Sequence, residues 1–289
     1  MKSKAQHAKR LVIYLLFAFG FAWIPWILMN RFWGYEEWFC TSHYIFFANL
    51  TLYAPALANI LTRLVTKEGF HDMKLRLRLK GHIPHYLTAW LLPISCALLG
   101  GLLVTAIYGR NNGNADGISG MGAAAAVLQA VFYAPLRAFL TFGEEFGWRG
   151  YMNDKMKPLF GTAGTVLIGG TIWGIWHAPL IVEGHNFGRD YAGYPYTGFL
   201  MMMLYCICLG TVLMWLTDHT GSVFPAVVFH AIVNFGAPTV FRLIARGVPQ
   251  TAESSVLKEF IVPELPIVLF SILFLILLLF RRKPVQKPI

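Results

Sequence analysis

Two adjacent carboxylates and a guanidinium lie in the segment GEEFGWRGY, residues 143–151, directly after a long apolar run. If this segment is a helix, Glu145 and Arg149 lie one turn apart and can form an ion pair. Glu144 points in another direction and has Trp148, not a cation, one turn further on. A desolvated carboxylate without an ionic partner suits a general base. Alternatively, both glutamates lie at the headgroup level and merely end the helix.

Two histidines and an asparagine occur in later apolar segments. His177 lies in TIWGIWHAPL, and His230 and Asn234 lie one helical turn apart in VVFHAIVNFGAP. Asn234 can fix the tautomer of His230, or both can donate to one substrate atom. Alternatively, each histidine is a packing residue and the His230–Asn234 pair is a polar clamp between helices.

Together these side chains suit the hydrolysis of an amide bond inside a membrane. A carboxylate, two imidazoles and an amide can activate a water molecule and stabilise an oxyanion. Glu144, His177 and His230 can also bind a divalent metal ion such as zinc and leave one position open for water. The residues leave both chemistries open, and the sequence lacks the HExxH pattern of soluble zinc proteases.

The elements that must position these residues are apolar runs long enough to cross a bilayer as helices. Hydrophobic residues make up 56% of the 289 residues, above the roughly 45–50% usual in soluble domains. The sequence therefore predicts an all-α fold, a polytopic membrane helix bundle of about eight transmembrane helices, forming one integral-membrane domain over residues 1–289. The predicted spans are 11–29, 44–62, 86–108, 121–145, 163–182, 198–216, 223–240 and 263–280. The first is longer and bulkier than the apolar part of a signal peptide, which favours an uncleaved span.

The basic residues indicate the orientation in the membrane. The net charge is +10, and most of the 24 Lys and Arg residues fall on the side predicted to hold both termini. Cytoplasmic loops are enriched in Lys and Arg, so the sequence predicts a protein of the cell membrane with both termini in the cytoplasm. Basic loops facing anionic lipid headgroups explain this charge better than nucleic acid binding does.

Three motifs in order resemble those of the CPBP family of intramembrane proteases, which includes CAAX proteases and bacteriocin-processing enzymes and is also called Abi. They are EExxxR from Glu144 to Arg149, an aromatic residue four before His177, and HxxxN from His230 to Asn234. The resemblance covers about residues 125–240, the fourth to seventh predicted spans. Trp173 stands where the family usually has Phe, which exchanges one aromatic residue for another.

The resemblance implies an intramembrane endopeptidase, related to the type II CAAX prenyl endopeptidases, that acts on a membrane-associated or lipid-modified peptide. Glu144 would activate water with help from His177, and Arg149 would hold Glu145 in place. His230 and Asn234 would contact the oxyanion. The family is commonly described as metalloproteases, so a divalent metal is again an option.

Two other classes of function stay open. One is a non-catalytic membrane factor, such as a bacteriocin self-immunity or scaffolding protein. The other is a transporter or proton relay, against which the absence of an inverted repeat in the sequence argues. In a protease, Glu144 and His177 must meet in one catalytic site. However, the helical rise places His177 deeper along its predicted span than Glu144 lies along its own. We therefore expect residues 151–163 to lie on the surface and the following helix to protrude into the cytoplasm.

Overall fold

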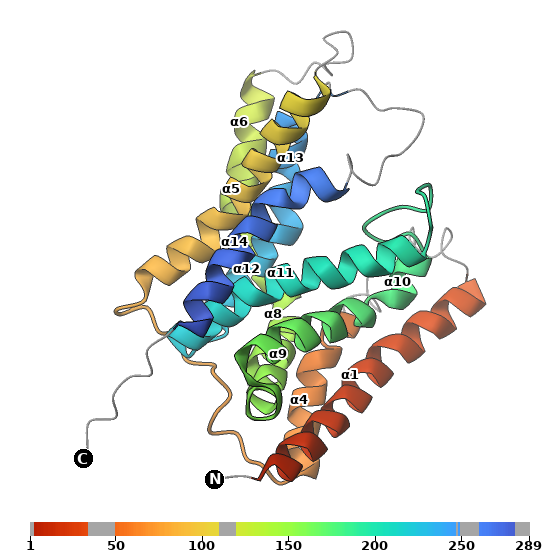
Figure 1. Cartoon of the computed structure of the whole chain (residues 1–289), viewed down its shortest axis with the longest axis vertical. Helices are drawn as coiled ribbons and strands as arrows, with labels where there is room; N and C mark the ends of the chain where they lie inside the picture. The colour runs from red at the N-terminus through yellow and green to blue at the C-terminus, as the bar shows by residue number, and fades with distance from the viewer. Residues whose placement is uncertain (1–2, 34–49, 110–119, 247, 249–259, 281–289) are drawn as a thin grey trace.

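The computed structural model describes residues 3–33, 50–109, 120–246, 248 and 260–280. Every regular element within these residues is a helix, which confirms the all-α prediction (Figure 1). In the described part of the chain, six helical stretches are long and apolar enough to cross a membrane, and two shorter apolar helices accompany them. The chain is therefore a polytopic integral membrane protein. The six stretches are Lys4–Phe32, Ile83–Tyr108, Ala138–Trp176, Tyr196–Thr220, Phe224–Ile244 and Val262–Leu279, and the shorter helices are Ala54–Val65 and Ala124–Leu136.

Two of the predicted spans are represented by the shorter helices. The span predicted at 44–62 is seen as α4 (Ala54–Val65), and residues 44–49 lie outside the described part of the chain. The span predicted at 121–145 is divided into α6 (Gly120–Leu128), the π-helix η2 (Gln129–Tyr133), α7 (Ala134–Leu136) and α8 (Ala138–Gly147). The break falls at Arg137, two residues after a proline that cannot donate a backbone hydrogen bond.

Arg137 lies between aromatic rings at this break. Its guanidinium carbon is 4.9 Å from the ring centre of Tyr133 and 5.1 Å from that of Phe235. Phe235 lies far along the chain from this break, so its ring comes from another helix. Cation–π contacts of this kind help an arginine to remain charged in apolar surroundings.

The chain turns sharply between the fourth and fifth predicted spans. α8 continues through the π-helix η3 (Trp148–Met152) into α9 (Asn153–Trp176), and Gly161 breaks α9 with φ 67°. That left-handed conformation favours glycine. Residues 153–160 therefore form a helical piece of their own, and Met156 on it is fully buried. The predicted position of residues 151–163 at the membrane surface stays a prediction. The protrusion of the following helix into the cytoplasm stays a prediction.

Many of the helices begin at or next to a proline. α4, α5 (Ile83–Tyr108), α10 (Ala178–Val182), α12 (Phe224–Phe235), α13 (Ala237–Ile244) and α14 (Val262–Leu279) all carry a proline in the first two helical positions. The missing N–H costs nothing there, because the first helical N–H groups have no partner within the helix. α1 (Lys4–Trp33) and α11 (Tyr196–Thr220) complete the bundle, in which α9 packs along α11 and α8 lies between α4 and α12 (Figure 1).

A buried ionic cluster ties the loop after α4 to the rest of the bundle. Glu68 accepts from Lys155 at 2.5 Å and from Arg10 at 3.3 Å through one carboxylate oxygen. Its other oxygen accepts from the hydroxyl of Tyr151 at 2.9 Å. We call these four residues the Glu68 cluster. It joins α1, η3 and α9 next to the segment that carries Arg149.

Candidate active site

Glu145 is the shared acceptor of an arginine and a histidine. Its Oε1 lies 3.0 Å from Nη1 of Arg149, which confirms the predicted i,i+4 ion pair. The same oxygen lies 2.8 Å from Nδ1 of His230. All three side chains are buried, with exposed fractions of 0% for Glu145, 3% for Arg149 and 4% for His230. Glu145 therefore joins the helix of the EExxxR motif to the helix of the HxxxN motif.

Glu144 has a neutral partner from a third helix. Its Oε2 accepts a hydrogen bond of 2.7 Å from Nε1 of Trp173, and only 2% of the residue is exposed. The expectation that Glu144 has no ionic partner agrees with these contacts, since an indole N–H carries no charge. The hydrogen bond from Trp173 nevertheless holds the carboxylate in one orientation. The residues next to Glu144 in the sequence do not predict this contact.

The two histidines each use Nδ1 for an acceptor in the protein. Nδ1 of His177 lies 2.9 Å from the carbonyl oxygen of Trp173, and Nδ1 of His230 faces the carboxylate of Glu145. Carbonyl and carboxylate oxygens only accept, so both Nδ1 atoms donate. In a neutral ring Nε2 is then an acceptor, and in a protonated ring it is a second donor. Nε2 is therefore the nitrogen of each histidine that remains available to a reactant.

Asn234 is not the hydrogen-bond partner of His230 that the i,i+4 spacing suggested. The partner that fixes the tautomer of His230 is Glu145, not Asn234. Asn234 is exposed on the last turn of α12. Among the described residues, the contacts that join Glu144, Glu145 and His230 do not include it. A role toward a bound substrate stays a prediction.

Glycines explain how these helices approach one another. Gly143 and Gly147 flank the two glutamates, and a Cβ at either position would collide with the backbone of Leu52 and Tyr53 or with Pro55 at the start of α4. Gly170 and Gly174 lie one turn apart on α9, where a Cβ would come within 2.5 Å of the Cα atoms of α11. Small residues four apart let membrane helices pack backbone to backbone. The glutamates and Trp173 are thereby brought into the interior.

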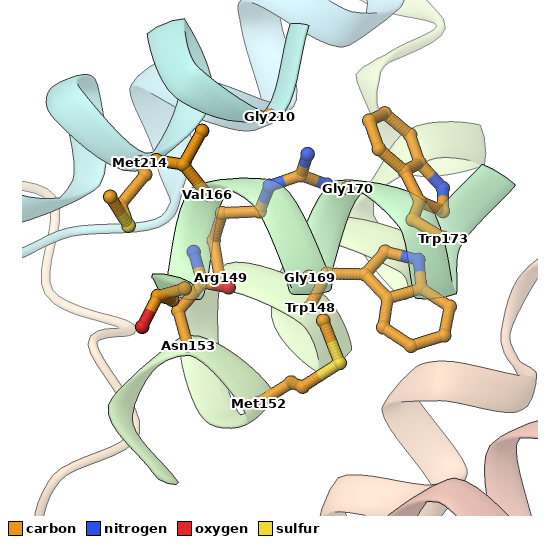
Figure 2. Close-up of a pocket in the computed structure, with 11 residues that line it drawn as sticks. Trp148, Arg149, Met152, Asn153, Val166, Gly169, Gly170, Trp173, Gly210 and Met214 are labelled. Atoms are coloured by element: carbon orange, nitrogen blue, oxygen red, sulfur yellow. The ribbon is translucent and has the colours of Figure 1, made fainter. Parts of the chain in front are cut away.

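A small cavity lies beside Arg149, between α9 and α11. Its volume is about 10 Å³, which is close to the room that one water molecule needs. Trp148, Asn153, Trp173 and Gly210 are among its lining residues, and Figure 2 shows the guanidinium of Arg149 between the helix of Gly170 and that of Gly210. The site therefore has polar groups and little free space between α9 and α11.

The segment that carries these residues also matches a known family. Residues 120–236, from α6 to the end of the HxxxN motif, match the family model described as Type II CAAX prenyl endopeptidase Rce1-like. The similarity to this family covers this segment, which is less than half of the chain. The resemblance of the three motifs to CPBP proteases is confirmed by this match and by the relatives below.

Two curated proteins are similar to parts of the chain. CAAX prenyl protease 2 of Methanococcus maripaludis is 26% identical over 92 residues, which are 32% of this chain and 34% of that protein. Lysostaphin resistance protein A of Staphylococcus haemolyticus is 29% identical over 148 residues, which are 51% of this chain and 36% of that protein. The chain thus spans about a third of the length of these relatives.

The Rce1-like segment does not present the metal site that the sequence allowed. Histidines that bind metals commonly donate their other nitrogen to a carbonyl or carboxylate, and His177 and His230 both do so. However, Glu144 gives one oxygen to Trp173, and no three His, Cys, Asp or Glu side chains in the described part of the chain are grouped to hold an ion. Glu144, His177 and His230 do not fit a shared zinc ion as placed.

Trp173 is the residue of this site that sequence reasoning passed over. In the sequence it stands only as an aromatic residue four positions before His177, where the family usually has Phe. Its indole N–H, which phenylalanine lacks, is the group that contacts Glu144. The available signal was a hydrogen-bond donor at a motif position that is usually apolar in the family.

Proposed function

We propose that the chain is an intramembrane endopeptidase that hydrolyses a peptide bond of a membrane-associated or lipid-modified substrate. The observation that carries this proposal is the buried carboxylate of Glu144 inside an Rce1-like membrane segment, next to the Glu145–Arg149–His230 network. Ionisable side chains within membrane helices are costly and commonly mark functional sites. The family match supports protease chemistry for this set.

Glu144 would act as the general base. Its Oε1, the oxygen that Trp173 does not hold, accepts a proton from water, and the water oxygen attacks the carbonyl carbon of the peptide. The C–N bond then breaks, and the leaving nitrogen takes the proton from Glu144. His177 orients the attacking water through Nε2.

His230 and Asn234 would stabilise the oxyanion of the tetrahedral intermediate. Nε2 of His230 can donate only when the ring is protonated, because Nδ1 already donates to Glu145. The carboxylate of Glu145 then compensates the charge of the imidazolium. In this mechanism Glu145 supports His230 as well as pairing with Arg149.

The substrate class rests on the relatives. The name CAAX prenyl protease 2 supports a substrate that carries a prenyl group. A prenyl chain would dissolve in the bilayer and bring the peptide to the membrane, which the bundle spans. The organism's own substrate would be found by comparing cellular peptides with and without Glu144→Ala.

The direct test uses the purified chain in proteoliposomes with a fluorescence-quenched peptide that ends in a farnesylated CAAX sequence. Glu144→Gln should lower kcat by about 100-fold or more without lowering the melting temperature, since general-base catalysis contributes about 10²–10⁴. Glu264→Gln changes a carboxylate in the first turn of α14 and serves as the control. Cleavage by Glu144→Gln at the wild-type rate would show that Glu144 is not the base.

A second function is favoured by the similarity to lysostaphin resistance protein A. The chain would then be a non-catalytic membrane factor that protects the cell or scaffolds a partner. Cells that carry Glu144→Gln or His230→Ala in place of the wild-type chain separate the two functions. Catalysis is excluded as the basis of any resistance that survives both substitutions.

A further inference from the structure

Trp173 contacts the site residues of both other motifs. Its Nε1 donates to Glu144 at 2.7 Å, and its ring centre lies 4.0 Å from the guanidinium carbon of Arg149 and 5.4 Å from the ring centre of His230. We propose that Trp173 is a positioning residue that fixes the orientation of the Glu144 carboxylate for catalysis. This inference rests on the proposed endopeptidase function and deepens it.

The indole N–H selects one oxygen of Glu144. An indole has a single donor, so it can hold one carboxylate oxygen and leave the other to the reaction. This hydrogen bond is buried, and its acceptor in the proposed mechanism is a carboxylate. Hydrogen bonds to an ionised acceptor are roughly twice as strong as those between neutral groups. Trp173 therefore sets which oxygen faces water and keeps that carboxylate from rotating.

The indole ring also separates the two halves of the network. Arg149 lies over the face of the ring, while the edge-to-face contact with His230 has an interplanar angle of 78°. Arg149 makes its ion pair with Glu145, and Glu144 bonds to the indole edge. The ring thus helps to assign Arg149 to Glu145 and leaves Glu144 to act as a base.

The backbone of Trp173 contributes a fourth contact. Its carbonyl oxygen accepts from Nδ1 of His177 at 2.9 Å, one turn further along α9. Trp173 lies between Gly170 and Gly174, which bring this part of α9 against α11. One residue therefore links His177 through its backbone to Glu144 through its side chain.

Trp173→Phe tests the proposal, because it keeps an aromatic ring and removes the N–H. With the farnesylated reporter peptide, kcat should fall about 10- to 100-fold while KM changes less than about twofold. The acid limb of the activity profile should move to higher pH, since a carboxylate that loses a donor binds its proton more tightly. Trp26→Phe is the matched control, because Trp26 is a buried indole on α1 that donates to Thr51 at 2.9 Å. An unchanged pH profile and kcat in Trp173→Phe would overturn the proposal.

A spectroscopic test does not depend on cleavage. The indole N–H band of Trp173 is obtained by subtracting the ultraviolet resonance Raman spectrum of Trp173→Phe from that of the wild type. The same subtraction is then made between Glu144→Ala and Glu144→Ala with Trp173→Phe. The indole N–H band obtained in this way should indicate a weaker hydrogen bond than in the wild type. An identical band in both backgrounds would overturn the proposal. If the band shifts but the wild-type chain does not cleave the farnesylated peptide, the contact is real and the proposed function fails, so the two failures are distinguishable.

Discussion

His230 and Glu145 are joined by a contact of 2.8 Å between Nδ1 and Oε1, although they lie on different membrane helices. The same carboxylate oxygen contacts Arg149 at 3.0 Å. Glu145 is therefore more than the partner of an arginine one turn away. It joins α12, which carries His230, to α8, which carries Glu145 itself.

The buried pair of Glu145 and Arg149 gives a stability prediction. Glu145→Leu should lower the free energy of unfolding by about 3–5 kcal/mol, because it leaves a buried guanidinium without its carboxylate. Glu145→Leu with Arg149→Met should be less destabilised than Glu145→Leu alone, since no unpaired charge remains. Thermal unfolding in detergent measures both. Equal melting temperatures for the single and double variants would show that the pair does not couple in this way.

The Glu68 cluster should contribute strongly to stability. Glu68→Leu removes the common acceptor of Arg10, Lys155 and Tyr151 and should cost about 3–5 kcal/mol. Asp72→Asn is the control, because the Asp72 side chain is 38% exposed and Arg63 keeps its hydrogen bonds to Asn59 and to the carbonyl of Gly69, so a smaller loss is expected. The measurement is chemical unfolding of both variants. A larger loss from Asp72→Asn than from Glu68→Leu would contradict the prediction.

Lys74 should hold the segment of Arg149 in place. Its Nζ donates to the carbonyl of Arg149 at 3.3 Å and to Asp154 at 2.7 Å, and its own carbonyl accepts from the N–H of Val223 at the start of α12. Lys74→Met should therefore speed amide hydrogen exchange in residues 148–152 by about tenfold. Lys80→Met, an exposed lysine of the same loop, should leave this exchange unchanged. Similar exchange in both variants would show that Lys74 does not anchor the segment.

Gly147 should not tolerate a larger residue. A Cβ at Gly147 would overlap the ring and the carbonyl group of Pro55, so Gly147→Ala should destabilise the protein by about 1–3 kcal/mol. Gly20→Ala is the matched control in α1, where nothing lies within 4 Å of an added Cβ. The melting temperatures of the two variants decide the comparison. A neutral Gly147→Ala would mean that α4 can move away from α8 at little cost.

The sequence predicts those features that depend on neighbours along one helix. The apolar runs indicate a polytopic membrane bundle, because each is long enough to span the bilayer. The i,i+4 spacing predicts the pair of Glu145 and Arg149, because residues one turn apart must meet on an α-helix. Local rules were less successful at Arg137, where a proline and a π-helix interrupt the predicted span.

Only the tertiary structure decides which side chains meet across helices. The same i,i+4 rule that found Arg149 suggested Asn234 as the partner of His230, whereas the partner is Glu145 from a helix far away in the sequence. Trp173 on α9 reaches Glu144 on α8, and Gly170 and Gly174 beside it let α9 lie close against α11. Helical periodicity fixes the direction of each side chain relative to its own helix axis. The rotation and approach of one helix against another depend on packing, and in this chain Gly143, Gly147, Gly170 and Gly174 leave room for neighbouring backbones.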